Sequence, residues 1–482
     1  MSEDTLSPPA RDRHVDAGDS GYSKSLTARH INMIAIGGAI GTGLFMGAGG
    51  RLASAGPALA VAYGVCGLFA FFVVRALGEL ILHRPSSGSF VSYSREFMGE
   101  KGAYVSGWLY FLNWSTTGIA DITAIALYVH YWGMFSDIPQ WTLALVALAV
   151  VLAFNLISVR IFGEMEFWFA IIKVAALVAF MLIGIFLLVT GEQVGGHDSG
   201  VHLLVSEGGF FPAGVLPVVL VMQGVIFAYS AVEMVGVTAG ETAEPEKIMP
   251  RAINSIMWRI AVFYIGSVLL LAMLLPYTVY QEGQSPFVTV LTQLGVPAAG
   301  DVMNLVVLTA AMSSLNSGLY TTGRILRSMA MAGSAPRFTG VMSGSKVPYG
   351  GIMLTCAVCV LGVGLNYALP AEAFEIVINF AAIGVMGTWG MIMLCHLLFY
   401  RRAKAGLLTR PSYRLPGSPY TEIVTLVFFA AIIVMMWFDE IGRYTIMALP
   451  AIVAALVVGW FVVRGRVGRI AAERAAVETA AE

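Results

Sequence analysis

The sequence predicts an all-α integral membrane protein with twelve transmembrane helices. Three observations support this: few residues are charged, the charged residues leave long gaps, and Lys and Arg alternate between the two sides of those gaps. Only 12% of the 482 residues are charged and 58% are hydrophobic, whereas about 25% of a soluble protein is charged. This composition excludes a soluble multidomain enzyme, and the net charge of −1 argues against a nucleic-acid-binding protein, which needs a basic face.

Twelve segments of the chain contain no Asp, Glu, Lys or Arg, and eleven of them reach or approach the roughly 20 residues that cross a bilayer as a helix. The exception is the eleventh, which is short, and we expect Glu422 beside it to lie at the membrane interface. The third segment is expected to continue past Asp121 to Trp132 as a long, tilted helix. The twelve segments are 30–50, 52–74, 102–120, 138–159, 174–191, 208–232, 260–281, 302–323, 347–371, 376–400, 423–438 and 444–463.

The positive charges predict the orientation of these helices. If the N-terminus is cytoplasmic and the chain alternates sides, 24 of the 28 Lys and Arg residues lie inside, as the positive-inside rule requires. Arg51 and Arg443 then lie outside, and Arg75 and Lys173 within the membrane. We therefore expect both termini in the cytoplasm, with no cleavable signal. The expected domains are a disordered tail (1–28), a twelve-helix transporter domain (29–465) and a C-terminal tail (466–482).

The first charge-free segment contains four glycines near its middle, Gly37, Gly38, Gly41 and Gly43. Glycine costs about 1 kcal/mol in a helix interior, and unwound backbone at membrane depth is tolerated only where it lines a cavity or is buried in protein. The pattern favours a discontinuous helix whose free amides face an anion. Close helix packing through Gly37 and Gly41 is the alternative.

The sixth segment carries a matching set of polar residues, Tyr229, Ser230 and Glu233, which need water, a partner or a break in the helix. Segments one and six are where a five-plus-five inverted repeat places its broken helices, here as repeats of about 29–191 and 213–400 followed by helices 11 and 12. A zwitterion suits such a site, with its carboxylate on the amides of the first break and its ammonium on the carbonyls of the second. The chain contains neither GxxxxGK[ST] nor HExxH, so ATP hydrolysis and zinc proteolysis have no visible site.

Several motifs resemble the bacterial and fungal amino acid permeases of the amino acid–polyamine–organocation superfamily, and the resemblance covers roughly residues 25–465. They are RH at 29–30, MIAIGGAIGTGLF at 33–45, PSSGSF at 85–90, EMEFWF at 164–169, AGET at 239–242, PRAI at 250–253 and SLNSGLY at 314–320. Two features depart from the common pattern: FAYSAVE at 227–233, and Asp121 where many members have glutamate. Together with TAEPEKIMP at 242–250, these departures look most similar to asparagine permeases.

The resemblance implies a fold of the leucine-transporter type and transport of an amino acid with an ion, usually a proton. By motif position, the substrate carboxylate is expected on Thr42, Gly43 and the adjacent Gly41. The substrate ammonium is expected on backbone carbonyls, and Phe227 also matches an aromatic gate over the substrate. The carbonyls belong to Ala39, Phe227 and Ser230.

Lys173 is the expected proton-coupling group, since proton-coupled relatives place a lysine of this helix near the first and eighth helices, and Ser313 and Ser314 match those positions. A desolvated lysine binds its proton less tightly, as a proton carrier requires. The alternative is a fixed structural pair with Glu166 or Glu233. Glu233 itself is either a proton relay or a strut that holds the second break.

Asn113, Thr117 and Asp121 lie on one face of the third helix, where they either recognise an amide side chain or serve the structure. Arg75 and Glu79 have the i, i+4 spacing of a structural ion pair. The CxxC cysteines, Cys356 and Cys359, are expected to be buried small hydrophobes rather than metal ligands.

The sequence thus predicts a secondary active transporter in the cell membrane that imports a neutral amino acid with protons, L-asparagine being the first choice. An obligate exchanger remains open, as do glutamine, alanine, proline and aromatic substrates. A channel would need rings of polar residues along a pore, and a sensor would need a larger signalling tail. No enzymatic activity, cofactor, metal or nucleic-acid partner is expected, and the oligomeric state is not determined by the sequence.

Overall fold

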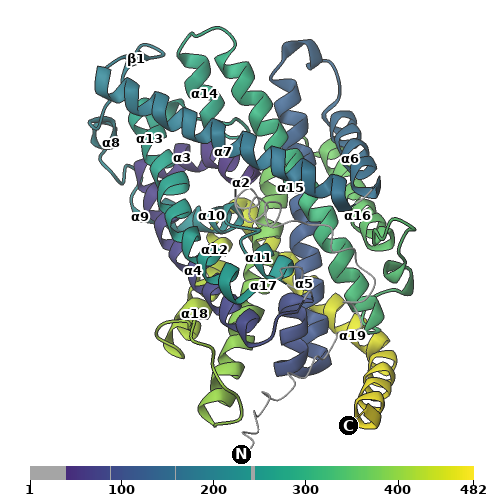
Figure 1. Ribbon diagram of the computed structural model, residues 1–482. Helices are drawn as coiled ribbons and strands as arrows, with labels where there is room; N and C mark the ends of the chain where they lie inside the picture. The colour runs from purple at the N-terminus through teal and green to yellow at the C-terminus, as the bar shows by residue number, and fades with distance from the viewer. Residues whose placement is uncertain (1–39, 87, 158, 240–244, 482) are drawn as a thin grey trace, which may run out of the picture.

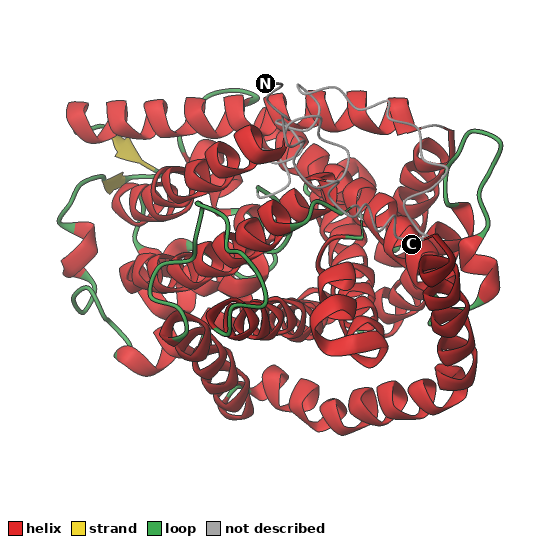
Figure 2. Ribbon diagram, turned by 60° about the horizontal axis from the view of Figure 1, so that its bottom comes forward, coloured by secondary structure: helices red, strands yellow, loops and turns green. Residues whose placement is uncertain are grey.

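The structure is a computed structural model that describes residues 40–86, 88–157, 159–239 and 245–481. The predicted N-terminal tail (1–28), Gly37, Gly38 and Ala39 lie outside the described residues. Helices make up nearly all of the described chain, and the strands β1 (Gln193–Val194) and β2 (His197–Asp198) form a short antiparallel hairpin in which Val194 pairs with His197, as Figure 2 shows.

The helices follow one another along the chain with short connections, and a π-helical stretch, Ile260–Gly266, joins α12 to α13. Their bounds are α2 (Thr42–Phe45), α3 (Gly47–Ala55), α4 (Leu59–His83), α5 (Ser89–His130), α6 (Gln140–Ile157), α7 (Val159–Thr190), α8 (Leu203–Ser206), α9 (Val215–Leu220), α10 (Met222–Ala228), α11 (Met234–Ala239), α12 (Pro245–Arg259), α13 (Ser267–Leu274), α14 (Pro286–Gln293), α15 (Ala299–Met331), α16 (Tyr349–Ala368), α17 (Ala373–Lys404), α18 (Tyr420–Met435) and α19 (Glu440–Ala481).

Within the described residues, nine helices are long and apolar enough to cross a membrane. Each of the twelve charge-free segments contains helix. Three local features explain why nine spans rather than twelve are found. The stretch Gly47–His83 joins the first two segments. α5 carries many polar residues, and the sixth segment is divided between shorter helices. The twelve-helix count stays a prediction.

α5 forms the centre of the helix packing, in contact with α15 and α17 along much of its length. Its 42 residues include a kink at Gly99, where φ is +74°, and it continues past Asp121 to His130 as the sequence predicts. The backbones approach closely at Gly384 of α17, where an added Cβ would lie 2.6 Å from Asn113 Cα. α5 therefore packs directly against α17, which contains the tenth charge-free segment.

A buried ion network ties the end of α4 to α17 and α18. Both ring nitrogens of His396 face carboxylates, at 3.0 Å from Glu79 Oε2 and 2.9 Å from Glu422 Oε1, which favours the doubly protonated ring. Arg410 donates two hydrogen bonds to Glu79, and these bonds hold the pKa of Arg410 above its ordinary value. Glu422, expected at the interface, is fully buried.

The expected ion pair between Arg75 and Glu79 is wrong. Arg75 instead donates to Asn254 Oδ1 at 2.7 Å and to the Arg414 carbonyl at 2.9 Å. The spacing of four residues places both side chains on one side of the helix, but partners far away in the sequence bind each of them. Cys356 and Cys359 are buried, as expected.

The C-terminal segment continues as helix rather than ending near residue 465, since α19 runs from Glu440 to Ala481. Its membrane-length apolar window is not buried at all, so it lies on the outside of the bundle. Beyond that window Arg466 donates to the carbonyls of Gly333 and Ala335 at 2.7 and 2.6 Å. These bonds attach the helix to the loop that follows α15.

Candidate functional site

A helix begins in the middle of the first charge-free segment. Gly41 has extended backbone angles (φ −134°, ψ −164°), and α2 starts at the next residue, Thr42. The amides of Thr42 and Gly43 belong to the first turn, so no carbonyl of the same helix precedes them as a partner. The Gly41 carbonyl accepts from the amides of Leu44 and Phe45, both at 3.2 Å.

The sixth segment is broken, as predicted. α10 ends at Ala228 and α11 begins at Met234, and between them Ala231 has φ of +78°, a left-handed conformation that is rare for alanine. The Phe227 carbonyl accepts from the Ser230 amide at 2.9 Å. One lone pair of that carbonyl remains for another donor.

The helix start at Thr42, at the predicted first break, lies against the break in the sixth segment near the centre of the molecule, where Figure 1 shows α2, α10 and α11. A Cβ added to Gly43 would lie 2.5 Å from Ala228 Cα, closer than real Cβ contacts. Glycine is therefore the residue that lets the start of α2 meet the end of α10. The break in the sixth segment is confirmed, whereas the part of the first segment before Ile40 lies outside the described residues, so a break in the first helix stays a prediction.

Asp121 connects the first break to α5. The Thr42 hydroxyl donates to Asp121 Oδ1 at 2.7 Å, and both residues are buried. One turn away, the Thr117 hydroxyl donates to the Asn113 carbonyl at 2.8 Å. Asn113 Nδ2 is buried and has no hydrogen-bond partner in the described part of the chain, so a buried amide donor is left over at this face of α5.

Lys173 lies in a buried chain of polar groups that joins α6, α7 and α15. Its Nζ donates to Ser313 Oγ at 3.0 Å, and Ser313 in turn donates to Glu166 Oε2 at 2.7 Å. Asn316 Nδ2 binds the other oxygen of Glu166 at 2.8 Å, and Asn155 Nδ2 binds Asn316 Oδ1 at 2.8 Å. Lys173 and Glu166 thus share one serine hydroxyl.

The other expected residues surround these two groups. Ser314 is half-buried, and its Oγ lies 3.9 Å from the position of a Cβ on Gly41, so it is beside the first break. Glu233 is fully buried and accepts from Trp389 Nε1 at 3.1 Å, while its Oε1 has no partner within the described residues. Phe227 is buried at 1% exposure. Asp121 and Lys173 are both fully buried, on α5 and α7.

The sequence did not single out Asn316, Asn155 or Trp389. Asn316 lies inside the SLNSGLY motif, but polar residues in a helix do not reveal which distant side chain they bind. Their partners are separated from them by about 150 residues or more, and only the packing of the helices brings them together.

Arg51, which the charge pattern places on the outer side, is buried, a feature that the charge pattern does not predict. It is 5% exposed and packs between α3 and α10, where a Cβ on Gly224 would lie 2.2 Å from its guanidinium. Its Nη2 has no partner among the residues that the structure describes. The buried Arg51 guanidinium also reaches Gly43, because its Nη1 donates to the Gly43 carbonyl at 3.5 Å.

Known proteins match this chain over nearly its whole length. The amino acid permease family model matches residues 30–474. An L-asparagine permease of Streptomyces coelicolor is 73% identical over 460 residues, which cover 95% of this chain and 94% of that protein. L-asparagine permease 2 of Mycobacterium tuberculosis is 59% identical, covering 95% of both chains. The L-asparagine permease of Escherichia coli is 56% identical over 97% of this chain and 94% of its own length.

These matches extend over nearly the whole chain, and the described helices include nine that are able to span a membrane. The chain is therefore a multi-pass membrane protein that belongs to the amino acid permease family.

Proposed function

We propose that the protein is a secondary active transporter that imports L-asparagine with protons across the cell membrane. Relatives at 56–73% identity over nearly the whole chain are named L-asparagine permeases, which supports the choice of substrate. The observation that carries the mechanism is the contact between two helix breaks, Gly43 against Ala228, with a buried carboxylate and a buried lysine beside them.

The proposed topology has twelve transmembrane helices, with inverted repeats at about 29–191 and 213–400 followed by helices 11 and 12. Both termini lie in the cytoplasm, and residues 1–28 and 466–482 are cytoplasmic. The helical content of all twelve charge-free segments supports this arrangement, as does the alternation of Lys and Arg.

The backbone of the two breaks is proposed to bind the substrate's charged groups. The first-turn amides at Thr42 and Gly43, with the neighbouring Gly41, present partial positive charge to the carboxylate. Carbonyls freed from regular helix present partial negative charge to the ammonium, and Phe227 closes over the bound molecule. The carbonyls are those of Ala39, Phe227 and Ser230.

Asn113, Thr117 and Asp121 are proposed to form the side-chain pocket. Because Asn113 Nδ2 is buried without a partner in the described chain, it is available to donate to the carbonyl oxygen of an asparagine side chain. A site built to satisfy a buried hydrogen-bonding group rejects analogues that leave it unpaired. The bond from Thr42 to Asp121 connects this pocket to the carboxylate site.

Proton coupling is proposed to use Lys173 with Ser313 and Ser314, since the lysine is buried and shares Ser313 with Glu166. Loss or gain of a proton on Lys173 changes the charge beside Asp121, and so the charge beside the substrate. Glu233, next to the second break, is assigned either to relaying the proton or to holding the break through Trp389.

On the side of the bundle where α3 lies, α3 packs against the loop before α14. A Cβ on Gly49 would lie 2.5 Å from the Gln284 carbonyl, and the Phe45 and Phe287 rings pack with centroids 5.2 Å apart. In the proposed orientation this is the outer side.

An obligate exchanger built from the same binding elements is the main alternative, followed by a permease for glutamine, alanine, proline or an aromatic amino acid. The variant Lys173→Met distinguishes symport from exchange. It is expected to lose uptake driven by a proton gradient but to retain exchange in vesicles preloaded with substrate. Lys101→Met, which changes an exposed lysine, is the matched control. Undiminished uphill uptake by Lys173→Met would remove Lys173 from the coupling mechanism.

A further inference from the structure

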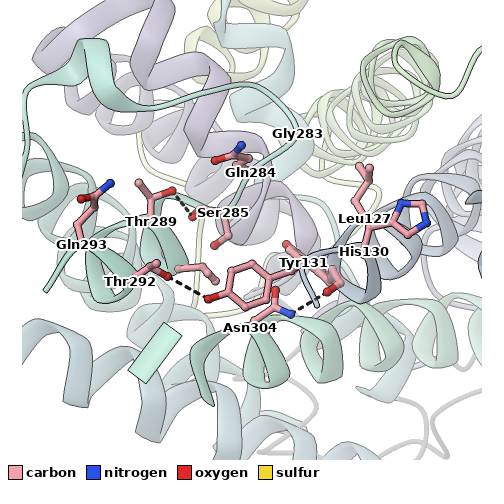
Figure 3. A pocket seen from close by; sticks show the side chains of 12 residues that line it. Leu127, His130, Tyr131, Gly283, Gln284, Ser285, Thr289, Thr292, Gln293 and Asn304 are labelled. Carbon is pink, nitrogen blue, oxygen red and sulfur yellow. Dashed lines mark hydrogen bonds between the residues drawn. The ribbon is translucent and has the colours of Figure 1, made fainter. Parts of the chain in front are cut away.

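A cavity of about 440 Å³ lies away from the broken helices. It is formed by the C-terminal end of α5, the loop before α14, α14 itself and the N-terminal part of α15 (Figure 3). α14 lies at the end of the molecule opposite to the described C-terminal helix (Figure 1). Small-molecule sites typically enclose about 300–1,000 Å³, so the cavity is large enough for an amino acid.

The walls of the cavity combine apolar surface with many hydrogen-bonding side chains. None of the described residues that line it is Asp, Glu, Lys or Arg, and His130 is the one side chain among them that can carry a positive charge. Side-chain amides and hydroxyls are the most numerous polar groups, but apolar atoms form the larger part of the wall. The polar side chains are those of Tyr128, His130, Tyr131, Gln284, Ser285, Thr289, Thr292, Gln293 and Asn304.

Some of these groups hold the wall together, and others are left over. Tyr131 and Thr292 bind each other through their hydroxyls at 3.1 Å, and Asn304 Nδ2 donates to the Tyr128 carbonyl at 2.7 Å; Figure 3 shows both bonds. The hydroxyls of Tyr128 and Ser285 are buried and have no hydrogen-bond partner within the described chain. A wall that is ordered, polar and partly unsatisfied is suited to a ligand that donates and accepts hydrogen bonds.

We propose that this cavity is a second binding site for a carboxamide, and that the amide side chain of asparagine or glutamine binds there. The amide class follows from the uncharged, hydrogen-bonding wall, while the identity of the amino acid rests on the proposed function. Aspartate and glutamate bind much more weakly, because a second carboxylate would lose water without meeting a positive side chain.

The cavity shares a loop with the contact between α3 and the segment before α14. Gln284 and Ser285 line it, and the Gln284 carbonyl is also one of the two that approach Gly49 of α3 most closely. A molecule that contacts Gln284 therefore touches the segment that covers α3.

The test measures how many asparagine molecules bind to each protein molecule. Radiolabelled asparagine is titrated to saturation against purified wild-type protein and the variant Thr289→Leu, both in lipid nanodiscs. Thr289 is only partly buried, so a leucine has room to extend into the cavity. Thr190→Leu, at an exposed threonine on α7, is the matched control. Uptake of asparagine by each protein into proteoliposomes is measured separately.

The proposal expects two asparagine molecules per wild-type protein, two for Thr190→Leu and one for Thr289→Leu. Tyr128→Phe should weaken the second site about two- to tenfold, the effect of one lost hydrogen bond. Aspartate should displace asparagine from neither site. Propionamide, which has the amide but lacks the amino-acid group, should displace only the asparagine bound in the cavity.

Equal stoichiometry in wild type and Thr289→Leu overturns the second site even if uptake is intact. Loss of one bound molecule in Thr289→Leu without any uptake by wild type supports the cavity and contradicts the proposed transport. If no protein binds asparagine although thermal unfolding shows that each is folded, both the second site and the proposed function are overturned.

Discussion

The contact between the two helix breaks predicts a large effect from one methyl group. In Gly43→Ala the new Cβ would lie 2.5 Å from Ala228 Cα and 3.0 Å from its Cβ. Because ordinary contact begins at 3.4 Å, the two segments must part by about 0.9 Å. The atom that the new methyl group meets, Ala228 Cα, belongs to the backbone, so no change of side-chain rotamer can relieve the contact.

The cost follows from what overpacking does in other proteins, about 1–3 kcal/mol. The strain falls on the amides and carbonyls that are proposed to bind asparagine, and 1.4 kcal/mol corresponds to a tenfold change in affinity. Gly43→Ala is therefore expected to weaken asparagine binding roughly 5- to 150-fold. Equilibrium binding to protein in nanodiscs measures the affinity, and thermal unfolding of the same samples shows whether the bundle remains folded.

A glycine with free space around it provides the control. Gly364 lies within α16, and nothing lies within 4 Å of an added Cβ. Gly364→Ala should bind asparagine like wild type and be equally stable or slightly more so. Wild-type affinity in a folded Gly43→Ala protein would refute the assignment of the two breaks to the substrate site.

Three further predictions address the polar groups. Thr42→Val and Asp121→Ala should each weaken asparagine binding about tenfold or more, and the double variant should lose less than the sum of the two, since both remove the same hydrogen bond; additive losses in the cycle would show that the two side chains do not act together in binding. Glu166→Gln should retain asparagine binding but lose most proton-driven uptake, measured in the same vesicles; normal uptake would exclude Glu166 from coupling. His396→Leu should lower the free energy of unfolding by about 3–5 kcal/mol because it leaves the buried Glu422 uncompensated, and His396→Leu with Glu422→Leu should recover part of that loss in thermal unfolding; a stable single variant would contradict the ion network.

The sequence was sufficient for features that depend on local composition. Long segments without charge predict helices because apolar side chains must leave water, and glycine predicts a break because it costs a helix stability. The helix start at Thr42 and the interruption before Met234 follow from such local rules. The contact of Lys173 with Ser313 came from a resemblance rather than from spacing.

Features that depend on distant partners were not predictable in this way. Arg75 and Glu79 have ideal spacing for a pair, yet Arg410, 331 residues from Glu79, binds that carboxylate instead. A bidentate guanidinium outcompetes a neighbour on the same helix because it makes two charge-assisted bonds. The burial of Arg51 was not predictable either, because it depends on small residues of another helix, such as Gly224, that leave room for the guanidinium.

The central claim is that this permease accumulates asparagine at the expense of a proton gradient. The most direct measurement is uptake of radiolabelled asparagine into proteoliposomes with an imposed inward proton gradient, with and without a protonophore and with a tenfold excess of each other amino acid. The proposal predicts accumulation above equilibrium that the protonophore abolishes and that unlabelled asparagine suppresses most strongly. Accumulation only in vesicles preloaded with amino acid, unaffected by the protonophore, would contradict it and identify an exchanger.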